Sequence, residues 1–357
     1  MNSAESQAVI DCDIHPGIPG MAVLLPYMTD YWREQFVSRA IDGMELASYP
    51  PNAPLTCRPD WRTPGARPAS SLETVQRQAL EGLGLSIAIC NPLYGGQVAM
   101  SDYMGGAICS AINDWMRAEW LDKEPRLRAS IVIAAQNPIA AAEEIDRCAD
   151  DKRFVQVLML VANELTLGRG YYWPIFEAAQ RHNLPIGIHA GSMYRYATTP
   201  TGWPTHLLHD YASTPQIFSA QMQSLLSEGV FSKFPDLKFV LIESGVGWVV
   251  PYMWRSTKTW RGVRGEVPWM KRAAIDEVRD RVRLTIQPFD GPDAGTDLER
   301  FVDQLGSDEM LLFSSDYPHW QFDGLDPMPP GISGDLARKI KSDNPLRTYP
   351  RLQETLS

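Results

Sequence analysis

Eight short runs of apolar residues recur along the chain, and stretches with helical periodicity separate them. The runs cover residues 9–15, 85–92, 127–134, 155–161, 184–191, 237–245, 282–288 and 310–319. Their apolar character is continuous rather than alternating, which is typical of parallel strands buried on both faces. The pattern therefore predicts eight parallel strands joined by helical crossovers.

The segments between these runs predict amphipathic helices, several of which begin with a Ser, Asn or Thr that can cap the first turn. The expected helices cover residues 71–84, 106–121, 137–151, 173–183 and 295–306. Eight strand-helix units favour an α/β fold, a distorted (β/α)8 TIM barrel, with a core over residues 9–320 in a single domain over 1–357. An open doubly wound sheet can also carry eight strands and stays the alternative.

Two segments interrupt this rhythm, residues 16–70 after the first run and residues 192–215 after the fifth. Both are rich in proline and aromatic residues and follow strands at the end where a barrel carries its site. We interpret them as loops and small helices that cap the mouth of the barrel. The proline-rich tail, residues 321–357, is expected to wrap the surface.

Four side chains that can bind metal fall at the carboxyl ends of predicted strands: Asp13 and His15, His189, and Asp316. In a parallel barrel these ends open onto one shared face, and closure brings the eighth strand beside the first. Each is weak by itself, because D-x-H triplets occur by chance and a lone buried histidine is usually structural. Together they predict a site for one divalent ion, with zinc expected ahead of manganese or iron.

Glu243 and His319 are further candidates for catalysis. Glu243 lies at the tip of the sixth run and either joins the site or is the buried partner of an arginine such as Arg255. His319 follows Asp316 by three residues. It either hydrogen-bonds substrate or a metal-bound water, or it stabilises its loop.

Candidates for substrate binding lie in the predicted loops, where tryptophan and tyrosine are abundant. Aromatic walls suit flat or apolar ligands, so we expect a small aromatic or cyclic substrate. Arg195 could clamp a carboxylate. The other expected substrate contacts are Trp203, His206, His209 and Trp248.

The composition excludes several classes of protein. The formal charge of −10 disfavours binding to nucleic acid and to anionic membranes. No uninterrupted apolar run is long enough for a membrane span, and the N-terminus lacks the features of a secretory signal. Five scattered cysteines without a CxxC pair fit a reducing cytoplasm. Serine-hydrolase, phosphate-loop and dinucleotide motifs are absent from the sequence.

Four sequence motifs resemble the amidohydrolase superfamily, specifically the amidohydrolase-2 branch that includes aminocarboxymuconate-semialdehyde decarboxylase and γ-resorcylate decarboxylase. The motifs are IDCDIH, YWPIFEAAQRHNLPIGIHAG, FPDLKFVLIESGVGWV and LLFSSDYPHW. The resemblance implies a mononuclear metal held by Asp13, His15, His189 and Asp316, and a homodimer or homotetramer. Many relatives carry a histidine for proton transfer at the position of Glu243, where this chain departs from the pattern.

The resemblance leaves two reactions open. We expect hydrolysis of a small cyclic or aromatic carbonyl compound by a metal-activated water, with Asp316 or His319 moving the proton. The alternative is nonoxidative decarboxylation of an aromatic or muconate-type acid, with Glu243 as the acid if burial raises its pKa. The missing histidine favours hydrolysis. A metal-free barrel that only binds ligands is a third interpretation.

Overall fold

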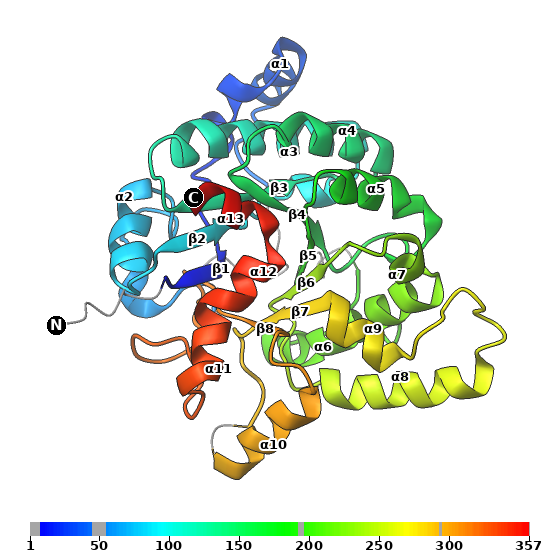
Figure 1. Ribbon diagram of the computed structural model, residues 1–357. Coiled ribbons are helices and arrows are strands. Elements are labelled where there is room, and N and C mark those ends of the chain that lie inside the picture. Colours follow the sequence, from blue (N-terminus) through cyan, green and yellow to red (C-terminus); the bar gives the residue numbers. More distant parts are fainter. Residues whose placement is uncertain (1–7, 45–54, 192–195, 293–294, 357) are drawn as a thin grey trace.

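The computed structural model describes residues 8–44, 55–191, 196–292 and 295–356, and in them eight parallel strands form one sheet in sequence order. The strands are β1 (Ile10–Ile14), β2 (Ile87–Cys90), β3 (Leu127–Val132), β4 (Phe154–Leu160), β5 (Ile186–His189), β6 (Phe239–Ile242), β7 (Val282–Thr285) and β8 (Leu311–Leu312). All strand residues are buried, as continuous apolar runs predict. The expected (β/α)8 barrel is confirmed (Figure 1).

Contacts between β1 and the chain after β8 close the barrel. The amide of Cys12 donates to the carbonyl of Phe313 over 2.9 Å, and the amide of Asp316 donates to the carbonyl of Asp13 over 3.1 Å. Ile14 and Tyr317 form an isolated parallel bridge. The end of the chain's eighth run therefore lies beside the first strand, as closure predicted.

Helices surround the strands on the outside of the barrel (Figure 1). The α-helices are α1 (Asp30–Ser38), α2 (Leu72–Val75), α3 (Asp102–Met116), α4 (Pro138–Cys148), α5 (Trp173–Arg181), α6 (Leu207–Ser227), α7 (Val230–Lys233), α8 (Val249–Val263), α9 (Ala274–Arg281), α10 (Gly295–Leu305), α11 (Gly334–Arg338), α12 (Asn344–Thr348) and α13 (Pro350–Leu356). Short π-helical turns at Gln76–Glu81 and Arg117–Leu121 extend α2 and α3. All five helices expected from periodicity are present.

The prediction that residues 192–215 form loops and small helices is partly wrong. A long helix, α6, begins at Leu207 and continues through Pro215 to Ser227. A proline inside a helix costs one backbone hydrogen bond, which disfavours a helix through Pro215. Tertiary packing outweighs this cost, since Ile217 and Phe218 are buried in the core.

The C-terminal tail does not simply wrap the surface, because it closes the amino end of the barrel. The Asn344 side-chain amide donates to the carbonyl of Leu311, at the start of β8. Arg351 is 1% exposed and donates to the carbonyl of Phe154, at the start of β4. Figure 1 shows α12 and α13 lying over that end of the strands.

All five cysteines are buried and none forms a disulfide. None of the helices in the described part of the chain is long and apolar enough to cross a bilayer.

Candidate metal centre

Four sequence-predicted ligands, Asp13, His15, His189 and Asp316, meet at the carboxyl end of the barrel with Glu243. His15 follows β1, His189 ends β5, and Glu243 follows β6. Glu243 and Asp316 have positive φ angles of 55° and 56°, a left-handed conformation that costs free energy for residues other than glycine. Such local strain clusters at functional sites, where surrounding contacts hold it in place.

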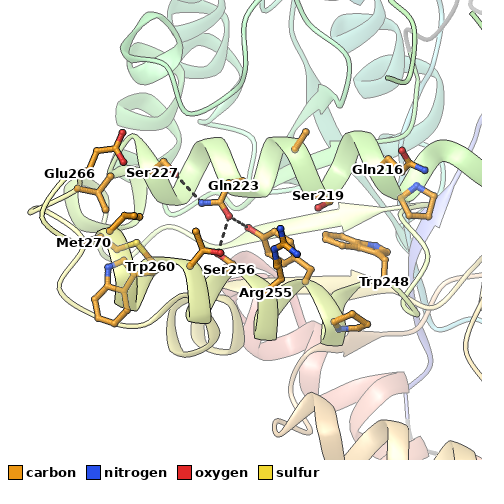
Figure 2. A pocket seen from close by; sticks show the side chains of 17 residues that line it. Gln216, Ser219, Gln223, Ser227, Trp248, Arg255, Ser256, Trp260, Glu266 and Met270 are labelled. Carbon is orange, nitrogen blue, oxygen red and sulfur yellow. Dashed lines mark hydrogen bonds between the residues drawn. The ribbon is translucent and has the colours of Figure 1, made fainter. Parts of the chain in front are cut away.

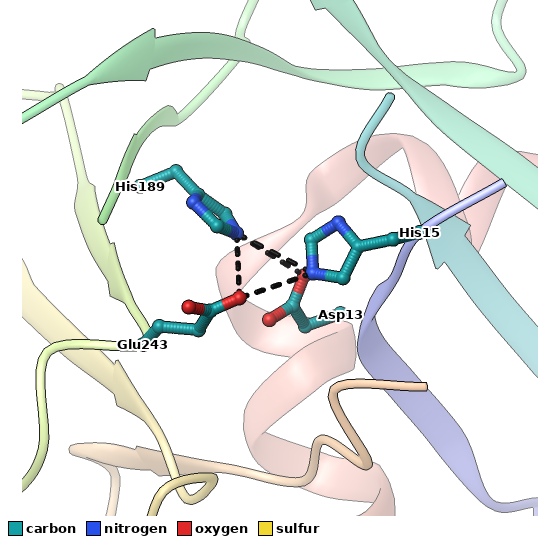
Figure 3. Close-up of side chains that lie close together, drawn as sticks. All are labelled: Asp13, His15, His189 and Glu243. Atoms are coloured by element: carbon teal, nitrogen blue, oxygen red, sulfur yellow. Dashed lines mark hydrogen bonds and ion pairs between the residues drawn. The ribbon is translucent and has the colours of Figure 1, made fainter. Parts of the chain in front are cut away.

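His15 and His189 point their Nε2 atoms into the cluster (Figure 3). The His15 Nδ1 donates to the carbonyl of Asn91 over 2.8 Å, and the His189 Nδ1 donates to the carbonyl of Ala190 over 2.5 Å. These backbone contacts fix the ring orientation and leave Nε2 as the atom for a cation. Metal-bound histidines are oriented in this way by outer hydrogen bonds.

His15 Nε2 is the centre of the cluster. It lies 3.2 Å from Asp13 Oδ1, 3.2 Å from Glu243 Oε1 and 3.0 Å from Asp316 Oδ1. His189 Nε2 lies 3.4 Å from His15 Nε2 and 3.1 Å from Glu243 Oε1 (Figure 3). Ligand atoms held at about 2.1 Å from one ion are separated by about 3 Å, so these distances match a coordination shell.

His319 forms the outer side of the same cluster. Its Nδ1 lies 2.6 Å from Asp316 Oδ1 and 3.4 Å from Glu243 Oε1. Its ring centroid lies 4.7 Å from that of His15. Its side chain is 22% exposed, whereas those of His189 and Asp316 are 1% and 0% exposed. His319 is therefore the imidazole of the cluster that a substrate can reach most easily.

The donor set fits a divalent cation. Three carboxylates and three imidazoles converge, and the Oδ2 atoms of Asp13 and Asp316 are buried without a hydrogen-bond partner in the described structure. A buried carboxylate oxygen without a donor is costly unless a cation compensates for it. This mixture of oxygen and nitrogen atoms suits zinc, manganese or iron.

The pKa shifts of the three histidines also indicate that the cluster stabilises positive charge. Burial on its own would lower the pKa of His15 and of His189, but Asp13 and Glu243 respectively raise them. Burial would also lower the pKa of His319, yet Asp316 and Glu243 raise it to about 10. Without a metal, protons fill the role of the cation, and metal binding would release them.

The pKa values of the Glu243 and Asp316 carboxyls shift in opposite directions. Burial on its own would raise the pKa of Glu243, but the charge of His189 and hydrogen bonds from its histidine neighbours lower it well below its usual range. Burial, followed by the charge of Glu243, raises the pKa of Asp316. The conditional expectation that burial makes Glu243 an acid is therefore wrong. The interpretation of Glu243 as a partner of Arg255 is also wrong, since histidines surround it.

Sequence reasoning missed the polar residues that hold the cluster. The Asn91 side-chain amide donates to Asp13 Oδ1 over 2.8 Å, and its own oxygen accepts from Ser130 and Gln156. Asp11 Oδ1 accepts the backbone amides of Asp13 and Ser315. The position of Asn91 near the end of the second apolar run, directly after β2, was the one available signal.

Tyr211, in the second turn of α6, is another residue that the sequence did not single out. Burial, followed by the charges of Glu243 and Asp316, raises the pKa of its phenol. The hydroxyl thus lies in the electric field of the cluster. The segment was expected to form loops and small helices, so the 21-residue helix that carries Tyr211 was not predicted.

The predicted substrate contacts in the loops are not brought to the cluster. His206 is the exposed N-cap of α6 and contacts Thr205, and His209 is exposed in the first turn. Trp203 is 54% exposed. Arg195 lies outside the described residues. A role for these residues in substrate binding stays a prediction.

Trp248 lines a groove of about 930 Å³ between α6 and α8, on the outside of the barrel. Tyr252, Arg255 and Trp260 line the same groove, and Figure 2 shows Trp248 and Arg255 on its α8 side. The Trp248 indole donates to the carbonyl of Gly245. No residue of the candidate metal cluster lines this groove. Contact of Trp248 with a substrate therefore stays a prediction too.

The family model described as amidohydrolase matches residues 10–351, nearly the whole chain. The chain belongs to the amidohydrolase family. The family resemblance of the four motifs is thereby confirmed.

Among curated relatives, this amidohydrolase is 28% identical over 225 residues to γ-resorcylate decarboxylase from Polaromonas sp. JS666. The match covers 60% of this chain and 66% of the relative, just under two thirds of its length.

Solved structures share the fold over nearly their whole length. An amidohydrolase from Mycobacterium avium subsp. paratuberculosis matches with a TM-score of 0.72 and 20% identity, covering 97% of this chain and 98% of the other. A dihydroxybenzoic acid decarboxylase from Polaromonas sp. JS666, with bound manganese and the inhibitor 2-nitroresorcinol, matches with a TM-score of 0.66 and 20% identity, covering 98% and 99%.

Proposed function

We propose that this amidohydrolase is a metal-dependent, nonoxidative decarboxylase of a small aromatic acid. One observation carries the proposal: His319 lies 3.4 Å from Glu243 and 2.6 Å from Asp316, beside the predicted metal ligands. Hydrolysis was expected because Glu243 replaces the histidine that many relatives carry. His319, which lies beside Glu243, can supply the proton that the histidine of those relatives would supply. The objection to decarboxylation is thereby removed. The curated decarboxylase relative supports the same choice.

The proposed ligands are Asp13, His15, His189 and Asp316. The ligand atoms of Asp13, His15, His189 and Glu243 lie close enough to hold one ion, and Asp316 joins His15 and Glu243 in an overlapping group with His319. A divalent cation, when bound, would offset the negative charge of the substrate carboxylate and polarise a neighbouring hydroxyl. Zinc was expected ahead of manganese, but the manganese in the dihydroxybenzoic acid decarboxylase favours manganese as the ion to test first.

His319 is the proposed proton donor. A proton from its imidazolium forms the new C–H bond at the ring carbon that carries the carboxylate. The bond between this carbon and the carboxyl carbon then breaks, its electron pair returns to the ring, and carbon dioxide leaves. Solvent returns the proton to His319, whose side chain is 22% exposed. Asp316 and Glu243 hold the imidazolium in position.

The test offers manganese-loaded protein 2,6-dihydroxybenzoate and other hydroxybenzoates in heavy water. We expect release of carbon dioxide and one deuterium at the ring carbon that lost it. Incorporation of labelled water oxygen into a product of a small ester, amide or lactone, without decarboxylation of any acid, would support hydrolysis instead. A protein that binds no metal would favour the metal-free interpretation.

A further inference from the structure

Arg58, in the segment between β1 and α2, is a buried cation that the cluster does not include. It is 7% exposed, and its guanidinium donates to both carboxylate oxygens of Asp60, each over 2.7 Å. Its Nη1 donates to the carbonyl of Gly324 over 2.5 Å. A single arginine thus joins the segment after β1 to the chain that follows the strand-8 loop.

Trp61 continues this connection toward the cluster. The guanidinium carbon of Arg58 lies 3.9 Å from the centroid of the Trp61 ring, a cation–π stack. The Trp61 ring also packs edge-on against the Tyr317 ring, and the two ring centroids lie 4.9 Å apart. Tyr317 is fully buried and directly follows Asp316.

Hydrogen bonds fasten the same two segments to each other. The backbone amide of Arg58 donates to the carbonyl of Pro318, and that of Trp320 donates to the carbonyl of Leu55. Gln78 receives the Tyr317 hydroxyl over 2.6 Å and donates to the carbonyl of Trp61 over 3.2 Å. The residues on both sides of His319 are therefore held by the segment 55–61.

The loop that is held in this way carries Asp316 and His319. Its backbone conformation is not the one of lowest free energy. Asp316 has a φ of 56°, and the backbone amide of His319 donates to the carbonyl of Asp316 over 2.8 Å. A strained loop keeps its geometry only when the contacts around it determine it. Arg58 and Trp61 supply such contacts from outside the barrel strands.

We propose that Arg58 is a positioning residue, which acts through Trp61 and the backbone to hold Asp316 and His319 in register with the metal ligands of the other strands. Its guanidinium contacts Asp60, Gly324 and the rings of Trp61 and Phe322. The inference rests on the proposed function for its effect on turnover, but its effect on cation binding can be measured without any substrate.

The experiment compares Arg58→Ala and Asp60→Asn with the parent protein, using manganese alone and then 2,6-dihydroxybenzoate. We expect the Kd for manganese to rise about 10-fold in Arg58→Ala, since outer-shell contacts commonly contribute 10- to 100-fold. We expect kcat to fall by about 10- to 100-fold with KM nearly unchanged. Asp60→Asn should shift both in the same direction by less.

Arg128→Met is the matched control, because Arg128 is 4% exposed and donates to the carbonyls of Pro125 and Leu127 at the amino end. It should lower the urea midpoint and leave the manganese Kd unchanged. An Arg58→Ala protein that is destabilised but binds manganese and turns over like the parent would overturn the positioning role. A rise in KM alone would also overturn it, since that indicates direct contact with substrate.

A double-mutant cycle that combines Arg58→Ala with Trp61→Phe tests whether Arg58 acts through Trp61. If Arg58 acts through Trp61, the losses in manganese affinity for the two single variants will not add in the double variant. Additive losses would contradict this route. If the parent binds manganese but decarboxylates nothing, the proposed function fails, while the manganese Kd values still decide the role of Arg58.

Discussion

The two ends of the barrel differ in whether their buried charged groups have hydrogen-bond partners. At the amino end, Arg128, Arg283 and Arg351 are each 4% exposed or less, and their guanidinium groups donate to backbone carbonyls that precede or begin strands. At the carboxyl end, buried carboxylate oxygens of Asp13 and Asp316 have no donor in the described structure. Satisfied buried charges stabilise a fold, whereas unsatisfied ones indicate a site awaiting a ligand.

The largest effect is expected from His15→Ala, which removes the imidazole at the centre of the cluster. Decarboxylation should fall by more than about 10³-fold, because the cation is no longer held. The matched control is His182→Ala, since His182 lies at the opposite end of the barrel and pairs with Asp146. Equal activity of the two variants in steady-state assays would contradict the claim that only the carboxyl end of the barrel carries the chemistry.

His319→Asn should come next, with a fall in kcat of about 10²- to 10⁴-fold, the usual contribution of a general acid. The asparagine can still accept or donate beside Asp316, so the manganese content should stay near that of the parent. Elemental analysis and kcat together check this expectation. A variant that loses the metal together with activity would make His319 a ligand rather than a proton donor.

At the amino end, Arg351→Met should reduce the free energy of unfolding by about 3 kcal/mol, because the carbonyls of Phe154 and His182 lose a buried donor. Its kcat should match that of the parent. Urea denaturation and a steady-state assay measure the two quantities. A loss of activity without a loss of stability would show that this end also takes part in the chemistry.

The smallest effect is expected at Glu124, near the amino end of β3, where hydrogen bonds from Arg126 lower the carboxyl pKa to about 2. Because the folded pKa lies below the unfolded one, this stabilisation is present above about pH 4.5 and is lost as the pH falls toward 2. Glu124→Gln should therefore lower the free energy of unfolding by about 1 kcal/mol at pH 7, allowing for screening by solvent. Urea midpoints that differ by the same amount at pH 7 and pH 3.5 would contradict the sign.

The barrel could be predicted from sequence because its strands are buried on both faces. Seven apolar runs contain the strand that they predicted, and the fourth misses only the first residue of β4, Phe154. The eighth run shows the limit. Only Leu311 and Leu312 form a strand, because the chain turns to a positive φ at Asp316 and pairs with β1 instead. Pattern alone does not reveal such a backbone change.

The convergence of the candidate ligands could be predicted because strand tips share one face. The residues that hold them in place could not be predicted. Asn91 and Asp11 act through hydrogen bonds across strands that are distant in sequence. Arg58 donates to the carbonyl of Gly324, 266 residues away, and stacks on Trp61, which contacts Tyr317 in the strand-8 loop. A polar residue in a loop gives no sign of its partner until the fold brings the two together.

Manganese binding by metal-free protein tests most directly whether the carboxyl end is a metal centre. Equilibrium dialysis of the parent and of His15→Ala should give one manganese per chain for the parent and almost none for the variant, with both proteins folded. No binding by the parent, or one equivalent still bound by His15→Ala, would contradict the assignment of this cluster.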